Sequence, residues 1–309
     1  MNANPNPAPN MRAVWSFWSK PFWAHKGRIW REPRHHLLAW GLSLKLACRH
    51  FAETQLITDT PGKTMLVDRL GLEFDQVSTE LDGLRNADPD WWALGKLTAY
   101  SVQQRPFVHL DTDVFLWKAL PPSLTSAPVL TQCPELHSWD ETRCAPSQVE
   151  TLFERHGLTL PVEWEWASSV NTHTFREENC GILGGNRVDF LRQYAQTAIG
   201  LIQDPAHRAA WGEAPNKGAI IIILEQYLLA ACLEYHRIDP RSPYRGVSVR
   251  HLFPSWEEAY NPHASARVGY THLLGDAKSR PAVVARLEQR LAQMDPVFVR
   301  HCERVARSV

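Results

Sequence analysis

The chain has 309 residues, of which 44% are hydrophobic, enough to bury a large core in one domain or in two tightly joined lobes. Its 33 basic residues balance 33 acidic ones, so charge argues against binding to nucleic acid or to an anionic membrane surface. The six cysteines include no CxxC pair, which argues against a structural zinc site and favours reduced thiols in a cytoplasmic protein.

The start of the chain and one apolar stretch bear on targeting. The segment MNANPNPAPN is polar and proline-rich, unlike a signal peptide, and we expect residues 1–12 to form a disordered tail. The apolar stretch AIIIILEQYLLAACL is shorter than the roughly 20 residues that a membrane span requires and contains Glu225 and Gln226. We therefore expect no transmembrane segment and interpret this stretch as a buried helix.

Strands and helices alternate along the first part of the chain. The apolar patterns predict strands at 13–17, 54–59, 74–78 and 107–110, with helices at 35–51, 61–71 and 91–104 between them. This alternation predicts an α/β fold, a parallel sheet with helices on both faces, in a single domain over residues 13–309.

The second part of the chain has a weaker pattern. The sequence from 121 to about 161 is proline-rich, and we expect an irregular region over 121–178 that faces a substrate. After it the pattern predicts a strand at 180–185, helices at 188–202 and 220–235, strands at 247–253 and 267–274, and one amphipathic helix at 280–307.

Asp111 and Asp113 form the first candidate site, because they follow the apolar run FVHL and precede another, VFLW. A DxD triplet is common by chance, but burying two like charges costs several kcal/mol unless a cation or donors compensate. A hard dication, Mn2+ or Mg2+, held by carboxylates and diphosphate oxygens would compensate them. Ligands of parallel sheets bind beyond the carboxyl ends of the strands, where this triplet falls. The alternative is a strand-end turn capped by aspartates.

The segment His272-Leu-Leu-Gly275-Asp-Ala-Lys278 is the second candidate, and it follows a late apolar strand. His272 can complete a metal coordination sphere, and Gly275 lets the backbone approach phosphates. Lys278 can neutralise a diphosphate leaving group. The alternative is an ordinary turn with a surface lysine.

Two further segments are candidates. The run Asn179-Cys-Gly181-Ile-Leu-Gly184-Gly185-Asn186 indicates a bulge or the close approach of another molecule, although it lacks GxGxxG spacing. Its asparagines can bond to hydroxyl groups, and the alternative is a purely structural glycine-rich loop. Glu225 and Gln226 lie inside an apolar helix, where a buried charge needs either a function, such as facing a donor sugar, or an arginine partner.

These segments, in this order, resemble the metal-dependent glycosyltransferases of GT-A fold. The pattern is DTD after a strand, NxGIxGGN, a helix with EQ, and a late HxxGxxK. It is most similar to the glycosyltransferase family 8 group, which includes glycogenin and bacterial lipopolysaccharide galactosyltransferases. The resemblance covers roughly residues 13–278 and implies a Rossmann-like, mixed but mostly parallel sheet. Ser279-Arg280-Pro281 stands where the family has proline and tryptophan.

The resemblance implies roles for particular residues. Asp111, Asp113 and His272 would bind Mn2+ (or Mg2+), and Lys278 would contact the diphosphate. Glu225 and Gln226 match an aspartate–glutamine pair near the anomeric carbon and would be the catalytic residues. The remaining donor-binding candidates are Trp15 and Ser16 with Lys20 at the base, Lys96 on the helix before DxD, Thr112, Asn179 and Gly181 at the sugar hydroxyls, Gly185 and Gly275.

The function that this resemblance implies is hexosyl transfer from a nucleotide-sugar, a UDP-sugar, to a glycan, lipid-linked, natural-product or peptide acceptor. We expect retention, because family 8 enzymes retain configuration and no carboxylate in the sequence can be assigned as an inverting base. The acceptor would enter over residues 121–178, near His173 and Glu177. One alternative is a nucleotidyltransferase of related fold, although VWSFWSKPF lacks the glycine-rich basic loop expected there. Another is a noncatalytic sugar-binding protein.

Overall fold

The computed structural model describes residues 11–25, 30–138, 145–171 and 173–307, so most of the predicted tail lies outside the described residues. The first strand begins at Arg12, and both Met11 and Arg12 are buried, which corrects the predicted end of that tail. The five described cysteines are free thiols, and Cys144 lies outside the described residues.

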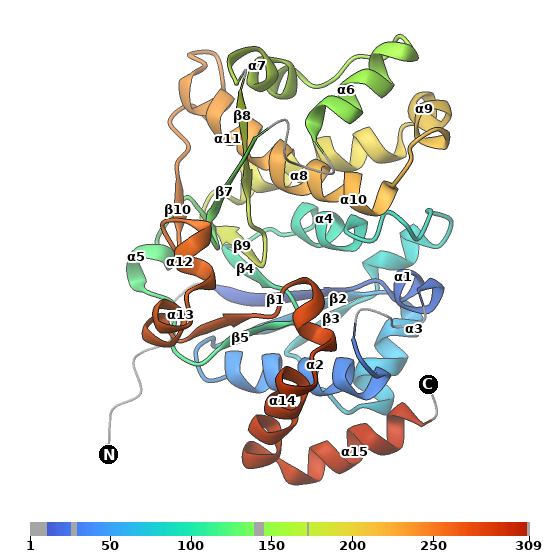
Figure 1. Cartoon of the computed structure of the whole chain (residues 1–309), viewed down its shortest axis with the longest axis vertical. Helices are drawn as coiled ribbons and strands as arrows, with labels where there is room; N and C mark the ends of the chain where they lie inside the picture. The colour runs from blue at the N-terminus through green and yellow to red at the C-terminus, as the bar shows by residue number, and fades with distance from the viewer. Residues whose placement is uncertain (1–10, 26–29, 139–144, 172, 308–309) are drawn as a thin grey trace.

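A seven-stranded sheet crosses the middle of the molecule in the order β10-β6-β9-β4-β1-β2-β3 (Figure 1). Its strands are β1 Arg12–Phe17, β2 Thr54–Thr58, β3 Gln76–Ser78, β4 Phe107–Leu110, β6 Val129–Thr131, β9 Ile182–Gly185 and β10 Val249–His251. Every pairing is parallel except the two that β9 makes, with β4 and with β6. The predicted α/β class with a mixed, mostly parallel sheet is confirmed.

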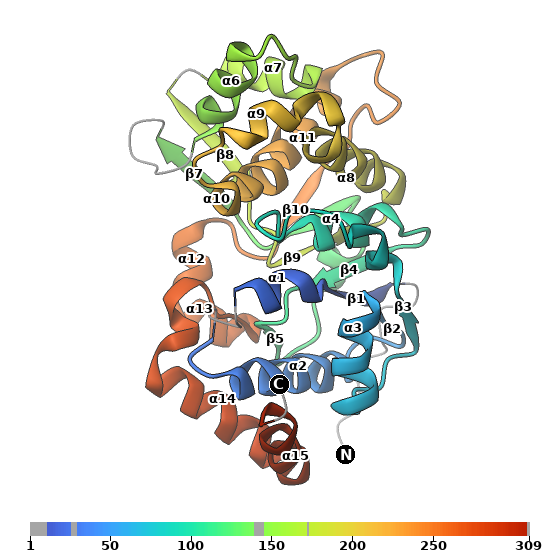
Figure 2. The ribbon, with the colours of Figure 1, turned by 90° about the vertical axis from the view of Figure 1, so that its right-hand side faces the viewer.

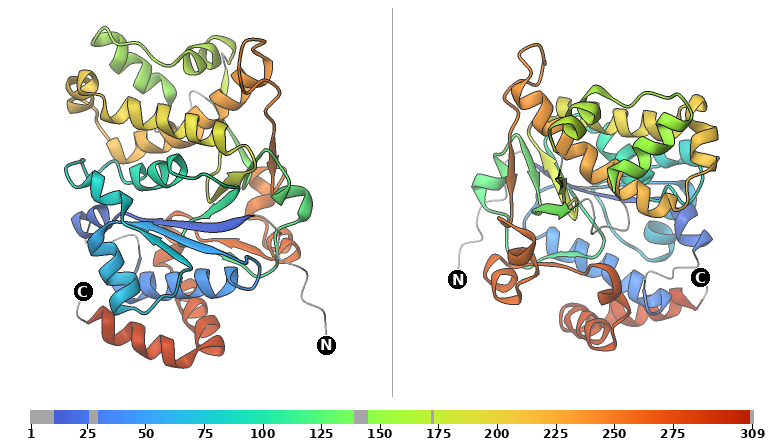
Figure 3. Two further views of the ribbon diagram at one scale, coloured as in Figure 1. Left: turned by 180° about the vertical axis from the view of Figure 1, so that it is seen from behind. Right: turned by 45° about the horizontal axis from the view of Figure 1, so that its top comes forward.

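Two smaller antiparallel sheets lie beside the large one. β5 (Val114–Leu116) pairs with β11 (Tyr270–His272), and β7 (Pro134–Ser138) pairs with β8 (Thr174–Glu178). The first of these sheets joins the segment after β4 to the segment that precedes α14. The second, which we call the β7–β8 ribbon, stands above the large sheet near α11 (Figures 1 and 3).

Helices cover both faces of the large sheet (Figure 2). One face carries α4 (Leu94–Ser101), α8 (Val188–Gln203), α10 (Lys217–Ile222) and α11 (Leu228–Ile238), and the other carries α2 (Pro33–Ala47), α14 (Pro281–Met294) and α15 (Pro296–Ala306). The other α-helices are α1 Ser19–Ala24, α3 Thr60–Lys63, α5 Pro122–Thr125, α6 Pro146–Arg155, α7 Val162–Val170, α9 Arg208–Gly212, α12 Trp256–Tyr260 and α13 Pro262–Val268.

The alternation of side chains along β1 divides the core in two. Val14 packs in the hydrophobic cluster on the α4 side, whereas Ala13 and Trp15 pack in the cluster on the α2 side. Successive strand residues point to opposite faces, and here each face has its own helical cover, so nearly every residue of β1 is buried. This explains why the strand reads as an apolar run and not as an alternating pattern.

The long apolar helix is a core element, as predicted. The helix Lys217–Ile238 is long enough to cross a membrane, and its most apolar 18-residue window has a mean hydropathy of 1.5, but 67% of that window is buried inside the protein. The helix changes to π geometry over Ile223–Tyr227, between α10 and α11.

Two predicted segments differ from the structure. Residues 121–178 are not irregular, because the described part contains α5, β6, β7, α6, α7 and β8; their prolines begin helices α5 and α6 and the strand β7. The helix expected over 280–307 is two helices, because the Asp295 side chain accepts a hydrogen bond from the Phe298 backbone N–H and Pro296 cannot continue α14.

Candidate functional site

The turn from Asp111 to Asp113 joins β4 to β5 at the carboxyl end of β4. The backbone N–H of Asp111 donates to the Gly181 carbonyl over 3.0 Å, and that of Val114 donates to the Asp111 carbonyl over 2.9 Å. β4 lies between β1 and β9 in the large sheet, so the turn is at the centre of the edge where parallel strands end. This is the location that the sequence analysis expected.

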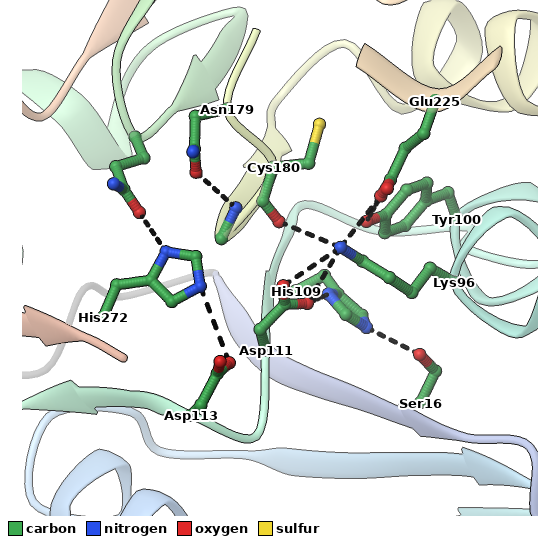
Figure 4. Close-up of polar contacts among 12 residues, drawn as sticks. Ser16, Lys96, Tyr100, His109, Asp111, Asp113, Asn179, Cys180, Glu225 and His272 are labelled. Carbon is green, nitrogen blue, oxygen red and sulfur yellow. Dashed lines mark hydrogen bonds and ion pairs between the residues drawn. The ribbon is translucent and has the colours of Figure 1, made fainter. Parts of the chain in front are cut away.

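The histidine of the late motif lies against this turn. β11 runs antiparallel to β5 and places His272 opposite Val114. Asp111, Asp113 and His272 each offer one ligand atom, and these atoms lie within 4.8 Å of one another. His272 Nε2 is 3.6 Å from Asp113 Oδ1 (Figure 4). The three residues predicted as metal ligands are therefore brought together.

Gln132 fixes the orientation of the His272 ring. His272 Nδ1 lies 2.7 Å from Gln132 Oε1, and the Tyr270 hydroxyl donates to the same oxygen over 2.6 Å. Because that oxygen only accepts, Nδ1 carries the hydrogen and Nε2 presents its lone pair toward Asp113. Burial lowers the pKa of His272, which favours the neutral ring. A neutral imidazole held through its other nitrogen is the usual state of a metal-binding histidine.

Two lysines compensate the carboxylates. Lys278 Nζ lies 2.6 Å from Asp113 Oδ2. Burial raises the pKa of Asp113, but Lys278 and His272 outweigh that effect and lower the pKa below its ordinary value. Burial raises the pKa of Asp111 to about 6, against the opposing effect of Lys96. The two aspartates of the motif therefore differ in electrostatic environment.

Lys96 bridges Asp111 to a buried glutamate. Its Nζ lies 2.9 Å from Asp111 Oδ1, 2.9 Å from Glu225 Oε1 and 3.3 Å from the Cys180 carbonyl (Figure 4). Burial lowers the pKa of Lys96, but Asp111 and Glu225 outweigh it, so the pKa is raised and the side chain is an ammonium. Helix α4 thus places the ammonium of Lys96 beside Asp111. Lys96 is the residue of this helix that the resemblance indicated.

Glu225, one of the two predicted catalytic residues, is a buried partner of Lys96. Its side chain is 0% exposed and receives a hydrogen bond from the Tyr100 hydroxyl over 3.0 Å as well as the Lys96 contact. These contacts place Glu225 on the opposite side of the Lys96 ammonium from Asp111, so it holds that ammonium beside the carboxylate. Gln226, the other predicted catalytic residue, follows it in the π-helical turn and is half-buried.

Gly181 and Asn179 lie at this site. A Cβ on Gly181 would stand 2.4 Å from His272 Nδ1 and 2.5 Å from Gln132 Oε1, so only glycine leaves room for this pair. Asn179 Oδ1 accepts from the Gly181 N–H over 3.0 Å, and its Nδ2 donates to Glu135. The Asn179 amide, predicted to bind sugar hydroxyls, thus has protein partners on both sides.

Trp15 is not at the site, contrary to the prediction. Its side chain is fully buried on the α2 side of β1, where its indole N–H donates to Ser43 Oγ over 3.1 Å and its ring packs edge-on against Phe74. Ser16 points the other way and contacts His109 Nε2 over 2.9 Å. Lys20 donates to the carbonyls of Arg85 and Ala87.

The remaining predicted donor residues are scattered. Gly185 lies opposite Phe107, at the far end of β9 from the site, and a Cβ there would stand 2.2 Å from the Pro128 carbonyl oxygen. It therefore allows the close approach of neighbouring backbone within the sheet. Thr112 is half-buried in the Asp111–Asp113 turn. Gly275 is exposed, with φ +50°, and begins the turn that carries Lys278.

Sequence reasoning missed Gln132 and His109. Gln132 follows β6 directly, and β6 runs parallel to β4, so its position after a strand is the signal that could have found it. That strand was inside the segment predicted to be irregular. His109 is buried in β4 with its Nδ1 3.8 Å from Asp111 Oδ1, and burial lowers its pKa well below the ordinary value.

The residues present fit a divalent metal ion. Two carboxylates and one neutral imidazole are donors that Mn2+ accepts. Asp113 Oδ2 is buried and makes no contact with hydrogen-bond geometry among the described residues, even though Lys278 is close. Three carboxylates, those of Asp111, Asp113 and Glu225, face two ammonium groups, which leaves negative charge for a cation to balance.

Fold and site together define an α/β protein with a cluster of metal-ligand-type residues at the carboxyl end of its central strands. Residues 11–304 match the model of the Family of unknown function (DUF6734), and the chain belongs to that family. No curated protein matches it.

Two solved glycosyltransferase structures are among those to which this chain is similar. The galactosyltransferase LgtC in complex with donor and acceptor sugar analogs has a TM-score of 0.40 and 11% identity, over 92% of this chain and 96% of that one. The bifunctional glycosyltransferase WbbM, in its apo structure, has a TM-score of 0.30 and 12% identity, over 64% of this chain and 35% of that one.

Proposed function

We propose that this protein is a metal-dependent hexosyltransferase of GT-A type, which moves a sugar from a UDP-sugar to an acceptor and uses residues 13–309 as one catalytic domain. The observation that carries the proposal is the cluster of Asp111, Asp113 and His272 with a lysine on either side. A dication centre flanked by two ammonium groups suits a diphosphate. The order of the sequence motifs supports the same activity.

Each residue at the cluster would have a separate role in sugar transfer. Mn2+ or Mg2+, held by Asp111, Asp113 and His272, would supply positive charge beside the diphosphate. Lys278 is partly exposed, so its ammonium can turn from Asp113 to a phosphate oxygen and stabilise the electron pair that leaves with UDP. Lys96, fixed by Glu225, would place its positive charge beside Asp111 on the donor side of the cluster. Gln132 would keep His272 Nε2 directed at the centre.

We propose retention of anomeric configuration. Glu225, the carboxylate expected near the anomeric carbon, is buried and paired with Lys96, so it does not suit a base that deprotonates the acceptor. The acceptor, a glycan, lipid-linked sugar, natural product or peptide, would approach from the side of the β7–β8 ribbon. His173 is exposed just before β8 and is a candidate for that contact.

The test is UDP release from a panel of UDP-sugars with Mn2+ and with chelator. Asp113→Asn should abolish release while the thermal melt of the metal-free protein stays nearly unchanged, because asparagine keeps the shape and Lys278 can reach water. The matched control is Asp189→Asn, an exposed aspartate paired with Arg187 on another part of the surface. Product stereochemistry by NMR tests retention.

Other outcomes would replace the proposal. Pyrophosphate release from nucleoside triphosphate and a sugar phosphate would indicate a nucleotidyltransferase. Sugar binding with neither UDP release nor metal-dependent UDP binding would indicate a noncatalytic sugar-binding protein.

A further inference from the structure

A second cluster of ligand-type side chains lies on the β7–β8 ribbon. Glu135 and Glu177 are direct cross-strand partners, and His137 follows Glu135 by two residues, so all three side chains project from one face. One ligand atom from each lies within 4.8 Å of the others. None of the three belongs to the cluster of Asp111, Asp113 and His272.

The polar atoms of this trio are incompletely paired. His137 Nε2 lies 3.1 Å from Glu177 Oε2 and 3.6 Å from Glu135 Oε2, and neither contact has hydrogen-bond geometry. The side chains of Glu177 and Glu135 are only 7% and 10% exposed. Glu177 Oε1 is buried with no hydrogen-bond partner among the described residues, and burial raises the pKa of this glutamate. Two nearly buried carboxylates thus share one imidazole nitrogen.

We propose that Glu135, His137 and Glu177 bind a second divalent cation of the Zn2+ class. Imidazole nitrogen and carboxylate oxygen are both zinc ligands, and three protein ligands leave a position for water. Around tetrahedral zinc with bonds of about 2.1 Å, neighbouring ligand atoms are separated by about 3.4 Å. The two distances from His137 Nε2 lie on either side of that value, so the side chains need little movement to close on an ion.

Neighbouring contacts fit this assignment. Asn179 Nδ2 donates to Glu135 Oε1, which orients that carboxylate as an outer hydrogen bond orients a metal ligand. A two-stranded ribbon is marginally stable by itself, so a cation that ties its strands together has a structural use. Asn179 also accepts from the Gly181 N–H, which connects the second cluster to the wall beside His272.

The competing state is a protonated histidine. The contacts with Glu135 and then with Glu177 raise the pKa of His137 to about 9, so the imidazole carries a proton at neutral pH when no metal is bound. A single hydrogen on Nε2 satisfies only one carboxylate, whereas a cation satisfies both, and metal binding would release this proton.

The experiment measures how many Zn2+ ions the full-length chain binds. The protein is stripped of metal with a chelator and dialysed to equilibrium against Zn2+, and the bound zinc is then measured by inductively coupled plasma mass spectrometry. Glu177→Gln and His137→Gln should each bind one Zn2+ fewer than the wild type. Asp113→Asn should still bind the Zn2+ that these two variants lose. The matched control is His236→Gln, since His236 Nε2 contacts a single carboxylate, Glu163, over the same 3.1 Å. That control should keep the wild-type count. Loss only in Asp113→Asn would support the first centre and refute this one.

A second measurement on the wild-type protein avoids dependence on variants that fail to fold. Long-range 1H–15N NMR of the histidines separates a doubly protonated ring from a metal-bound one. Zn2+ should convert His137 from the doubly protonated to the metal-bound form. Any change at His272 would be a separate event at the first cluster. An unchanged spectrum, or an unchanged zinc count in Glu177→Gln, would show that the trio is an internal ion pair and would overturn the proposal.

Discussion

Replacing Lys96 with methionine removes the ammonium that stands between Asp111 and Glu225. Methionine keeps the length and apolar stem of the side chain, so packing in α4 changes little. What changes is the electrostatic state of Glu225, which is 0% exposed and then keeps only the Tyr100 hydroxyl as a donor among its described side-chain contacts.

The size of the effect follows from this burial. Removing one partner of a buried ion pair costs about 3–5 kcal/mol, because the other charge is left uncompensated. At roughly 2 °C per kcal/mol for a long chain, Lys96→Met should lower Tm by about 6–10 °C. Adding Glu225→Gln removes the orphaned charge and leaves a carbonyl to accept from Tyr100, so the double variant should recover most of the loss.

Urea and thermal unfolding of the wild type, both single variants and the double variant, all without metal, measure the coupling between the two residues. Glu225→Gln alone should cost less than Lys96→Met, since Lys96 keeps Asp111 as its partner. A double variant no more stable than Lys96→Met, or a Lys96→Met protein as stable as wild type, would refute the assignment of Glu225 as the residue that positions Lys96.

Three further predictions concern the metal centre, each read from Mn2+ titration by calorimetry. Gln132→Met should weaken Mn2+ binding about 10–100-fold, because His272 loses its outer hydrogen bond, and unchanged affinity would contradict that orientation. Gly181→Ala should also weaken binding by displacing His272, whereas the control Gly200→Ala, whose Cβ meets nothing within 4 Å, should not. Because burial raises the pKa of Asp111 to about 6, its carboxyl gains a proton as pH falls. Affinity should therefore drop about tenfold from pH 7 to pH 5, and a flat profile would count against Asp111 as a ligand.

The sequence by itself determined the class of fold and the location of the central site. The run FVHL before Asp111 is buried in β4, and alternating strands and helices specify a mostly parallel sheet. In such a sheet the segment after a strand falls at the ligand-binding edge, so the position of Asp111 and Asp113 follows from local pattern alone. The order of the motifs predicted that His272 lies with Asp111 and Asp113, and the structure places it beside these two aspartates.

Only the tertiary structure decided which side chains face the site. Trp15 and Ser16 are neighbours in one buried strand, and the choice of face depends on the helices that cover each side, which no local pattern specifies. Glu225 appeared as a charge in an apolar helix, but its partner, Lys96, is far away in the chain and on another element. Gln132 acquires its role only when β6 and β11 come together, because a hydrogen bond between distant segments is a property of packing.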